Sequence, residues 1–281
     1  MKLLKTKQQV RAWRKEQSGP VGFVPTMGYL HEGHAELLKA SVEQNDVTVL
    51  SIFVNPTQFG PNEDLDRYPR DFERDQALAE SLGVDAIFYP SVEEMYSTTT
   101  TLSIQPGAMA TKLCGASRPG HFDGVLQIVT KLFHIVQPTN AYFGQKDAQQ
   151  LALIESLVES YDFPLTVHRI PTVREQDGLA KSSRNVFLNN KERKEAAVLF
   201  QALQHGKELV ESGARTDDVI RSVKAMIETN TSGRVDYVEL LSYPNLEVQE
   251  NAPLSILATA VFFTKARLID NILIERVNAH A

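Results

Sequence analysis

Two histidines, His31 and His34, stand three residues apart where an apolar run gives way to a helical pattern. Residues 21–24 are apolar and short enough for a buried strand, and a turn containing Gly28 follows them. The next segment has apolar residues that suit one face of a helix, namely Ala35, Leu37, Leu38 and Ala40. A strand, a glycine-bearing turn and a helix begin a βαβ unit, whose turn directs backbone N–H groups at a bound anion. We therefore predict that the two histidines face an anion, in particular a nucleotide phosphate.

Two other interpretations of the histidine pair stay open at this point. A His-x-x-His pair also occurs by chance among surface and core residues, where it has only a structural role. A zinc pair is a poorer match, because helical zinc ligands prefer the i, i+4 spacing and a single cysteine leaves few further ligands.

Polar side chains follow two other predicted strands. Asn55 and Gln58 come after a β-branched run at residues 46–54, and Lys146 stands between a strand at residues 141–143 and a helix that Asp147 is placed to cap. In open α/β sheets ligands bind outside the carboxyl ends of the strands, where a cation can also reach a phosphate. The alternatives are that the two amides cap a turn and that the lysine is a solvated turn residue.

Residues 174–190 interrupt the alternation of strands and helices. Lys181, Ser182, Ser183 and Arg184 are consecutive hydrogen-bond donors, and Gly178 allows the chain to bend before them. Such a loop suits a mobile lid over an anionic group, because it has little apolar surface to anchor it. A plain solvated loop is the alternative.

The order of the predicted elements indicates the fold class. Strands and helices alternate up to residue 170, which predicts a doubly wound, Rossmann-like parallel sheet in a domain of residues 1–174. A smaller α+β domain of residues 175–281 is predicted from two helices and an antiparallel sheet. The other predicted segments are helices at 3–17, 71–82, 125–136, 192–210 and 216–228, strands at 85–89, 166–170, 235–241, 255–263 and 267–274, a weaker strand at 102–105, and loops at 98–101 and 115–124.

Composition excludes several classes of protein. The 281 residues are 42% hydrophobic and 23% charged, an ordinary globular balance, and the formal charge of −6 argues against a nucleic-acid binder. No apolar run of 18 residues is present, and residues 1–14 do not have the pattern of a signal peptide. The single cysteine, Cys114, excludes internal disulfides and predicts a reducing cytoplasm.

Six sequence blocks together resemble the pantothenate synthetase (pantoate–β-alanine ligase) family, within the nucleotidyltransferase superfamily that carries the H-x-G-H signature. They are PTMGYLHEGH from Pro25, FVNPTQF from Phe53, YPR from Tyr68, RPGHFDGV from Arg118, FGQKDAQQL from Phe143 and DGLAKSSRN from Asp177. The resemblance covers nearly the whole chain and implies ATP-driven condensation of pantoate with β-alanine. The implied products are pantothenate, AMP and pyrophosphate, with Mg²⁺ as cofactor and a homodimer as the usual assembly.

The resemblance also implies roles for individual residues. His34, His31, Lys146 and Arg184 would act on the phosphates, Gln58, Gln150 and Asn55 would bind substrate, and Asp75 is a candidate metal ligand. The nucleotide would be bound by Met27, Gly28, Tyr29, Leu30, His31, Glu32, Gly33, His34, Gly144, Gln145, Lys146, Asp147, Val173, Lys181, Ser182, Ser183 and Arg184. No side-chain nucleophile is required, because the pantoate carboxylate itself would attack the α-phosphorus. The protein would have to orient the reactants and neutralise the charge on the phosphates.

The chain departs from the family pattern at three positions. Members of the family often have Glu, Tyr and Met where this sequence has Gln145, Ala148 and Lys181. Two other functions remain open: a transferase that leaves the nucleotide on its product, and a nonenzymatic nucleotide-binding module. A tRNA synthetase is disfavoured, because the chain is acidic and too short to include an anticodon domain.

Overall fold

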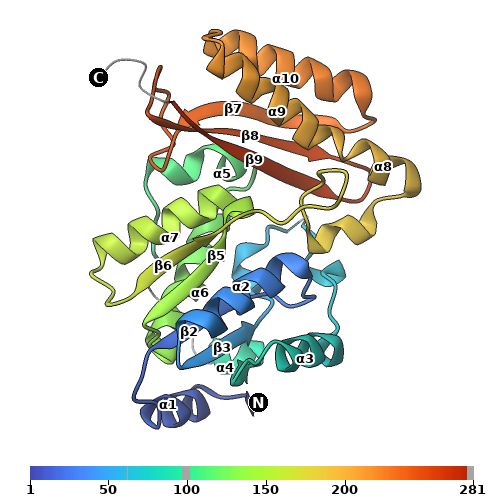
Figure 1. Ribbon diagram of the computed structural model, residues 1–281. Helices are drawn as coiled ribbons and strands as arrows, with labels where there is room; N and C mark the ends of the chain where they lie inside the picture. Colours follow the sequence, from blue (N-terminus) through green and yellow to red (C-terminus); the bar gives the residue numbers. More distant parts are fainter. Residues whose placement is uncertain (62, 97–101, 277–281) are drawn as a thin grey trace. The chain divides into compact units, whose positions relative to one another are not determined.

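The computed structural model describes residues 1–61, 63–96 and 102–276, and the chain divides into two compact units (Figure 1). Unit 1 is Met1–Pro106, Arg118–Gln145 and Leu153–Pro171, and unit 2 is Gly107–Ser117, Lys146–Ala152 and Thr172–Ala281. The chain therefore passes between the two units several times. The two continuous domains predicted for residues 1–174 and 175–281 stay a prediction.

Unit 1 contains a six-stranded sheet in the order β1-β4-β3-β2-β5-β6, in which every neighbouring pair is parallel. The strands are β1 (Lys2–Leu4), β2 (Val21–Thr26), β3 (Val47–Ile52), β4 (Ala86–Phe88), β5 (Asn140–Gly144) and β6 (Thr166–Ile170). The central strands are nearly continuous apolar runs because both faces of a parallel sheet are covered. The predicted doubly wound parallel sheet is confirmed, with the strand at residues 47–52 in its interior.

Helices cover both faces of this sheet. The helices in or mainly in unit 1 are α1 (Lys7–Lys15), α2 (Glu32–Gln44), α3 (Phe72–Ser81), α4 (Val92–Met95), α6 (His121–Val136) and α7 (Ala148–Ser160). On one face, Leu38 of α2 and Ala79 of α3 belong to a buried cluster with Leu50 of β3. On the other face, Phe133 of α6 makes edge contacts with Phe23 and Phe143, at ring-centroid distances of 6.5 and 6.4 Å. Several candidate residues of unit 1 follow the carboxyl ends of β2, β3 and β5 in this sheet.

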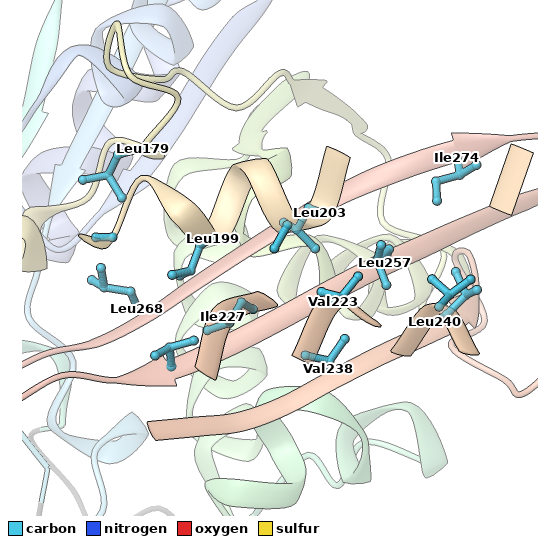
Figure 2. Close-up of a cluster of buried hydrophobic side chains, with 14 of the residues drawn as sticks. Leu179, Leu199, Leu203, Val223, Ile227, Val238, Leu240, Leu257, Leu268 and Ile274 are labelled. Carbon is cyan, nitrogen blue, oxygen red and sulfur yellow. The ribbon is translucent and has the colours of Figure 1, made fainter. Parts of the chain in front are cut away.

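Unit 2 is built on an antiparallel sheet in the order β7-β8-β9. Its elements are α5 (Leu113–Ser117), α8 (Asn190–Glu195), α9 (Val198–Glu211), α10 (Thr216–Asn230), β7 (Arg234–Ser242), β8 (Leu254–Phe262) and β9 (Arg267–Glu275). Figure 2 shows Leu203 of α9 and Val223 of α10 packed over Leu257 of β8. The adjacent Ile256 packs in a different cluster with Leu113 of α5. Since side chains alternate along a strand, both faces of this sheet are buried.

The structure corrects four of the predicted elements. Residues 3–17 do not form one helix, because Lys2–Leu4 pairs with β4 as an edge strand and α1 starts after the Thr6 cap. The predicted loop at 115–124 is largely helical, since α5 ends at Ser117 and α6 begins at His121. Residues 102–105 form no strand, and the helix predicted at 192–210 is two helices, α8 and α9. The loop predicted at 98–101 lies outside the described residues. No described helix is long and apolar enough to cross a membrane.

Candidate active site

The turn between β2 and α2 has an unusual backbone. Gly28 and Tyr29 both have positive φ, of 81° and 49°. A side chain at Gly28 would bring its Cβ to 2.9 Å from an Asp75 oxygen and from Ile52, so the position needs glycine for both space and conformation. A non-glycine residue such as Tyr29 is held in this region only when its surroundings stabilise it. The turn is therefore built by contacts from elsewhere in unit 1.

Asp75 of α3 supplies those contacts. Its two carboxylate oxygens accept hydrogen bonds from the backbone N–H groups of Tyr29 and Leu30, each at 2.7 Å. The neighbouring Arg74 donates to the Leu30 carbonyl at 3.1 Å and lies over the Tyr29 ring. Asp75 is only 1% exposed, and burial raises its pKa, an effect that the two backbone hydrogen bonds and Arg74 oppose. Asp75 thus acts on the turn itself, a role that the sequence reasoning did not find.

His31 and His34 interlock at the start of α2. The Nδ1 atom of His31 accepts from the Gly33 N–H at 3.1 Å, and the Nδ1 atom of His34 accepts from the His31 N–H at 3.3 Å. The two rings lie 4.1 Å apart, centroid to centroid. An Nδ1 atom that accepts a hydrogen bond carries no proton, so each neutral imidazole has its N–H at Nε2. Two Nε2–H groups near the positive end of a helix dipole are chemically suited to an anion.

The place of this turn in the sheet agrees with a ligand site. β2 lies between β3 and β5, and the chain leaves β2 toward one side of the sheet and reaches β5 only later. The order of strands reverses at this pair, and open α/β sheets bind ligands in the crevice at such a switch point. A cavity of about 580 Å³ also borders the turn, lined among others by Met27, Gly28, Tyr29, Phe53 and Tyr89.

The two amides predicted at the end of β3 contact each other. Asn55 donates from Nδ2 to the Gln58 Oε1 atom at 3.2 Å, and Gln58 donates from Nε2 to the Met27 sulfur at 3.2 Å. Asn55 and Gln58 are 1% and 8% exposed, so they are not ordinary solvated turn residues. The donor end of Gln58 thus points to Met27, the residue that follows β2 and begins the turn to α2.

The R-P-G-H motif clamps the loop that carries Gln58. Arg118 forms a bidentate ion pair with Glu63 at 2.7 and 2.5 Å and donates to the Nε2 atom of His121 at 2.9 Å. The Nδ1–H of His121 donates to the Gln58 carbonyl at 2.7 Å. Burial alone would raise the pKa of Glu63, but the Arg118 contacts hold it below the usual value. Arg118 and His121 belong to one of the six sequence blocks, which gave them no role, whereas Glu63 lies outside those blocks and could not be predicted.

The other candidate residues belong to unit 2, except for Gly144 and Gln145, which lie in unit 1 at the end of β5. The Lys146 ammonium lies 3.6 Å from Asp147, and the Lys146 carbonyl accepts from the Asn271 side chain at 2.8 Å. Gln149 is buried and donates to the Met109 and Lys112 carbonyls, whereas Gln150 is half-buried. Of the two adjacent glutamines, Gln150 is therefore the better placed to bind a ligand.

The loop with four donors is better anchored than its sequence suggested. Leu179 is 3% exposed and belongs to the core of unit 2, and Arg174 forms a bridge with Ala180. Lys181 donates its N–H to the Val173 carbonyl at 2.9 Å and forms an ion pair with Glu175. Ser182 caps the short 3-10 helix of Ser183–Phe187, which contains Arg184. The structure thus brings Val173 and residues 181–184 together in one segment of unit 2, and the mobility of this loop stays a prediction.

The chain is similar to members of one protein family in both sequence and structure. The family model described as pantoate–beta-alanine ligase matches residues 2–273. The pantothenate synthetase of Lysinibacillus sphaericus is 54% identical over 275 residues, which cover 96% of this chain and 97% of that protein. The crystal structure of pantothenate synthetase from Thermus thermophilus has a TM-score of 0.92 at 43% identity, covering 97% of this chain and 99% of that one. The pantoate–beta-alanine ligase from Francisella tularensis, solved with beta-gamma ATP and beta-alanine, has a TM-score of 0.81 at 34% identity and covers 97% of both chains.

Proposed function

This chain belongs to the pantoate–β-alanine ligase family and forms pantothenate, and we propose that it does so through a pantoyl adenylate made from ATP. In the first step a pantoate carboxylate oxygen bonds to the α-phosphorus of ATP while the bond from that phosphorus to the bridging oxygen breaks. Pyrophosphate leaves with the electron pair. In the second step the β-alanine amine attacks the acyl carbon and loses a proton, and AMP leaves.

The observation that carries the proposal is the pair of Nε2–H donors at the start of α2. Backbone N–H groups donate to both Nδ1 atoms, so the ring donor of each neutral histidine is Nε2–H, which supports a role for both in phosphate binding. Charge develops on the phosphate oxygens as pyrophosphate leaves, and preorganised donors stabilise it without reorganisation. We assign Lys146 and Arg184 to the same task, and Met27–His34, Gly144–Asp147, Val173 and residues 181–184 to nucleotide binding.

We assign pantoate binding to Gln58 and Gln150, and to Asn55, which contacts Gln58. The Nε2 group of Gln58 donates to a methionine sulfur, which is a weak acceptor that a carboxylate or hydroxyl oxygen can replace. Hydrogen bonds from amides at fixed positions would orient the carboxylate for in-line attack. The pantoyl adenylate is a mixed anhydride that water can hydrolyse. Residues 175–281, predicted to act as a lid, would protect it from water.

Isotope exchange tests the order of the two steps. The protein is expected to exchange labelled pyrophosphate into ATP when given pantoate and Mg²⁺ without β-alanine, because the adenylate forms before any amine is present. Cys114→Ser should leave this exchange nearly intact, since no side-chain nucleophile takes part.

Three outcomes of this assay would contradict the proposal. Exchange that needs β-alanine would indicate a concerted or differently ordered reaction, and exchange without pantoate would indicate a nucleotide bound covalently to the protein. ATP binding with no exchange under any condition would favour the nonenzymatic nucleotide-binding module.

Mg²⁺ is proposed to enter with ATP, bound mainly by phosphate oxygens and water. Among the described residues, no group of three His, Cys, Asp or Glu side chains could hold a metal ion. Asp75, the predicted ligand, already accepts two backbone hydrogen bonds. A direct role for Asp75 in metal binding therefore stays a prediction that the next experiment tests.

Asp75→Ala is expected to destabilise the protein by about 2 kcal/mol or more, because one buried and one part-buried backbone N–H group lose a charged acceptor. The ATP KM should rise as the turn loosens, and the Mg²⁺ concentration for half-maximal activity should stay the same. Thermal unfolding and Mg²⁺ titrations at saturating ATP measure the two effects. A raised Mg²⁺ requirement with unchanged thermal stability would instead make Asp75 a metal ligand.

A homodimer and a cytoplasmic location complete the proposal. The homodimer follows from the family, and the cytoplasmic location follows from the single cysteine, which suits a reducing compartment. Light scattering coupled to gel filtration measures the first directly.

A further inference from the structure

We propose that Tyr96 is a positioning residue for Gln58 and that it acts through Asn55. The inference rests on the proposed role of Gln58 in pantoate binding and adds a residue that lies outside the matched sequence blocks. All the residues involved belong to unit 1.

The hydroxyl of Tyr96 is held at the end of α4. Tyr96 caps this helix, its backbone N–H donates to the Val92 carbonyl at 2.8 Å, and its ring contacts Phe53 at a centroid distance of 6.3 Å. The Lys131 ammonium lies 5.3 Å from the ring centroid. The ring is therefore fixed by helix, aromatic and cation contacts. Burial raises the pKa of Tyr96, so the hydroxyl keeps its proton at neutral pH.

That proton is donated to Asn55. The Tyr96 hydroxyl lies 2.7 Å from the Asn55 Oδ1 atom, which also accepts from the Thr57 hydroxyl at 3.1 Å. At the other end of the amide, Nδ2 donates to the Gly124 carbonyl at 3.1 Å and to the Gln58 Oε1 atom. All four sites of a buried amide are thus matched, which leaves it a single orientation.

The orientation of Asn55 determines the orientation of Gln58. Because Asn55 offers its Nδ2 group, Gln58 must present Oε1 to it and direct Nε2 away, toward Met27. Helix α6 approaches this loop so closely that a Cβ at Gly124 would lie 2.4 Å from the Thr57 carbonyl oxygen. The backbone on both sides is therefore held closely, and the Tyr96 hydroxyl begins a chain of hydrogen bonds that runs through Asn55 to the Gln58 side-chain amide.

The test is Tyr96→Phe, which removes the hydroxyl and keeps the ring. We expect the pantoate KM to rise about three- to tenfold, the effect of losing one neutral hydrogen bond, while the ATP KM changes by less than about twofold. The matched control is Tyr142→Phe, which removes from β5 another buried hydroxyl, one that bonds Asn45 and Gln44. It should lower the melting temperature without changing either KM, which separates positioning from loss of stability.

A double-mutant cycle tests the route through Asn55. Tyr96→Phe should have no further effect on the pantoate KM in an Asn55→Ala background, because Asn55→Ala already removes the hydrogen bonds that connect Tyr96 to Gln58. Additive effects would show that Tyr96 acts by another route, and an unchanged pantoate KM in Tyr96→Phe alone would overturn the inference. Pantoate-dependent exchange by the wild-type protein, measured first, separates this failure from failure of the proposed function.

Discussion

His34→Ala is expected to lower kcat by about 10²–10³-fold, the usual effect of losing one preorganised donor to developing charge. Weakening of ATP binding should be much smaller, because backbone N–H groups of the turn and the helix dipole remain. The Nδ1 atom of His34 accepts from the His31 N–H, so the ring nitrogen that donates is Nε2. Single-turnover rates and equilibrium ATP binding measure the two quantities separately.

A matched pair of amide substitutions sharpens this prediction. The oxygen of an asparagine side chain can occupy the place of Nδ1, so His34→Asn should keep the bond to the His31 N–H but lose the donor at Nε2. His34→Gln can place an amide N–H near the Nε2 position and should retain more activity than His34→Asn. A folded His34→Ala protein within about threefold of wild-type kcat would show that the histidine is structural. Equal rates for His34→Asn and His34→Gln would argue against Nε2 as the donor.

The sheet could be predicted because its strands carry their own signal. β2, β3 and β5 are apolar runs followed by turns, and such runs identify buried parallel strands without reference to their partners. β1 could not be predicted in this way. Lys2–Leu4 is three residues long and is a strand only because it pairs with Ala86, Ile87 and Phe88. Residues 107–117 likewise belong to unit 2 because of their tertiary contacts, although the segments before and after them in the sequence belong to unit 1.

The same limit applies to the candidate site. His31, Gly28, Asn55 and Gln58 could be predicted because they follow strands in short motifs. The residues that hold them in place could not. Asp75 reaches the turn from more than 40 residues away in the sequence, and Tyr96 reaches Asn55 over a similar distance. Such partners have no local pattern, since their residue types are ordinary for the helices that carry them.

Lys146→Met is expected to cost activity on the same scale as His34→Ala, on the order of 10²-fold or more in kcat. Methionine keeps the unbranched stem and removes the charge that would stabilise the leaving phosphates. The backbone at this position is held independently, because Asn271 donates to the Lys146 carbonyl at 2.8 Å. The ion pair with Asp147 is long, at 3.6 Å, and Asp147 is about half exposed, so its loss should have little effect on stability.

The comparison that decides the role of Lys146 is between two variants with the same backbone. Lys146→Arg keeps the positive charge but replaces a compact ammonium by a planar guanidinium, so it should recover part of the rate. If charge near the phosphates is what matters, pyrophosphate exchange should fall in the order wild type, Lys146→Arg, Lys146→Met, with melting temperatures that agree closely. Equal exchange rates in Lys146→Met and the wild type would mean that this lysine is a solvated turn residue. A melting temperature that falls in parallel with the rate would mean that its role is in folding.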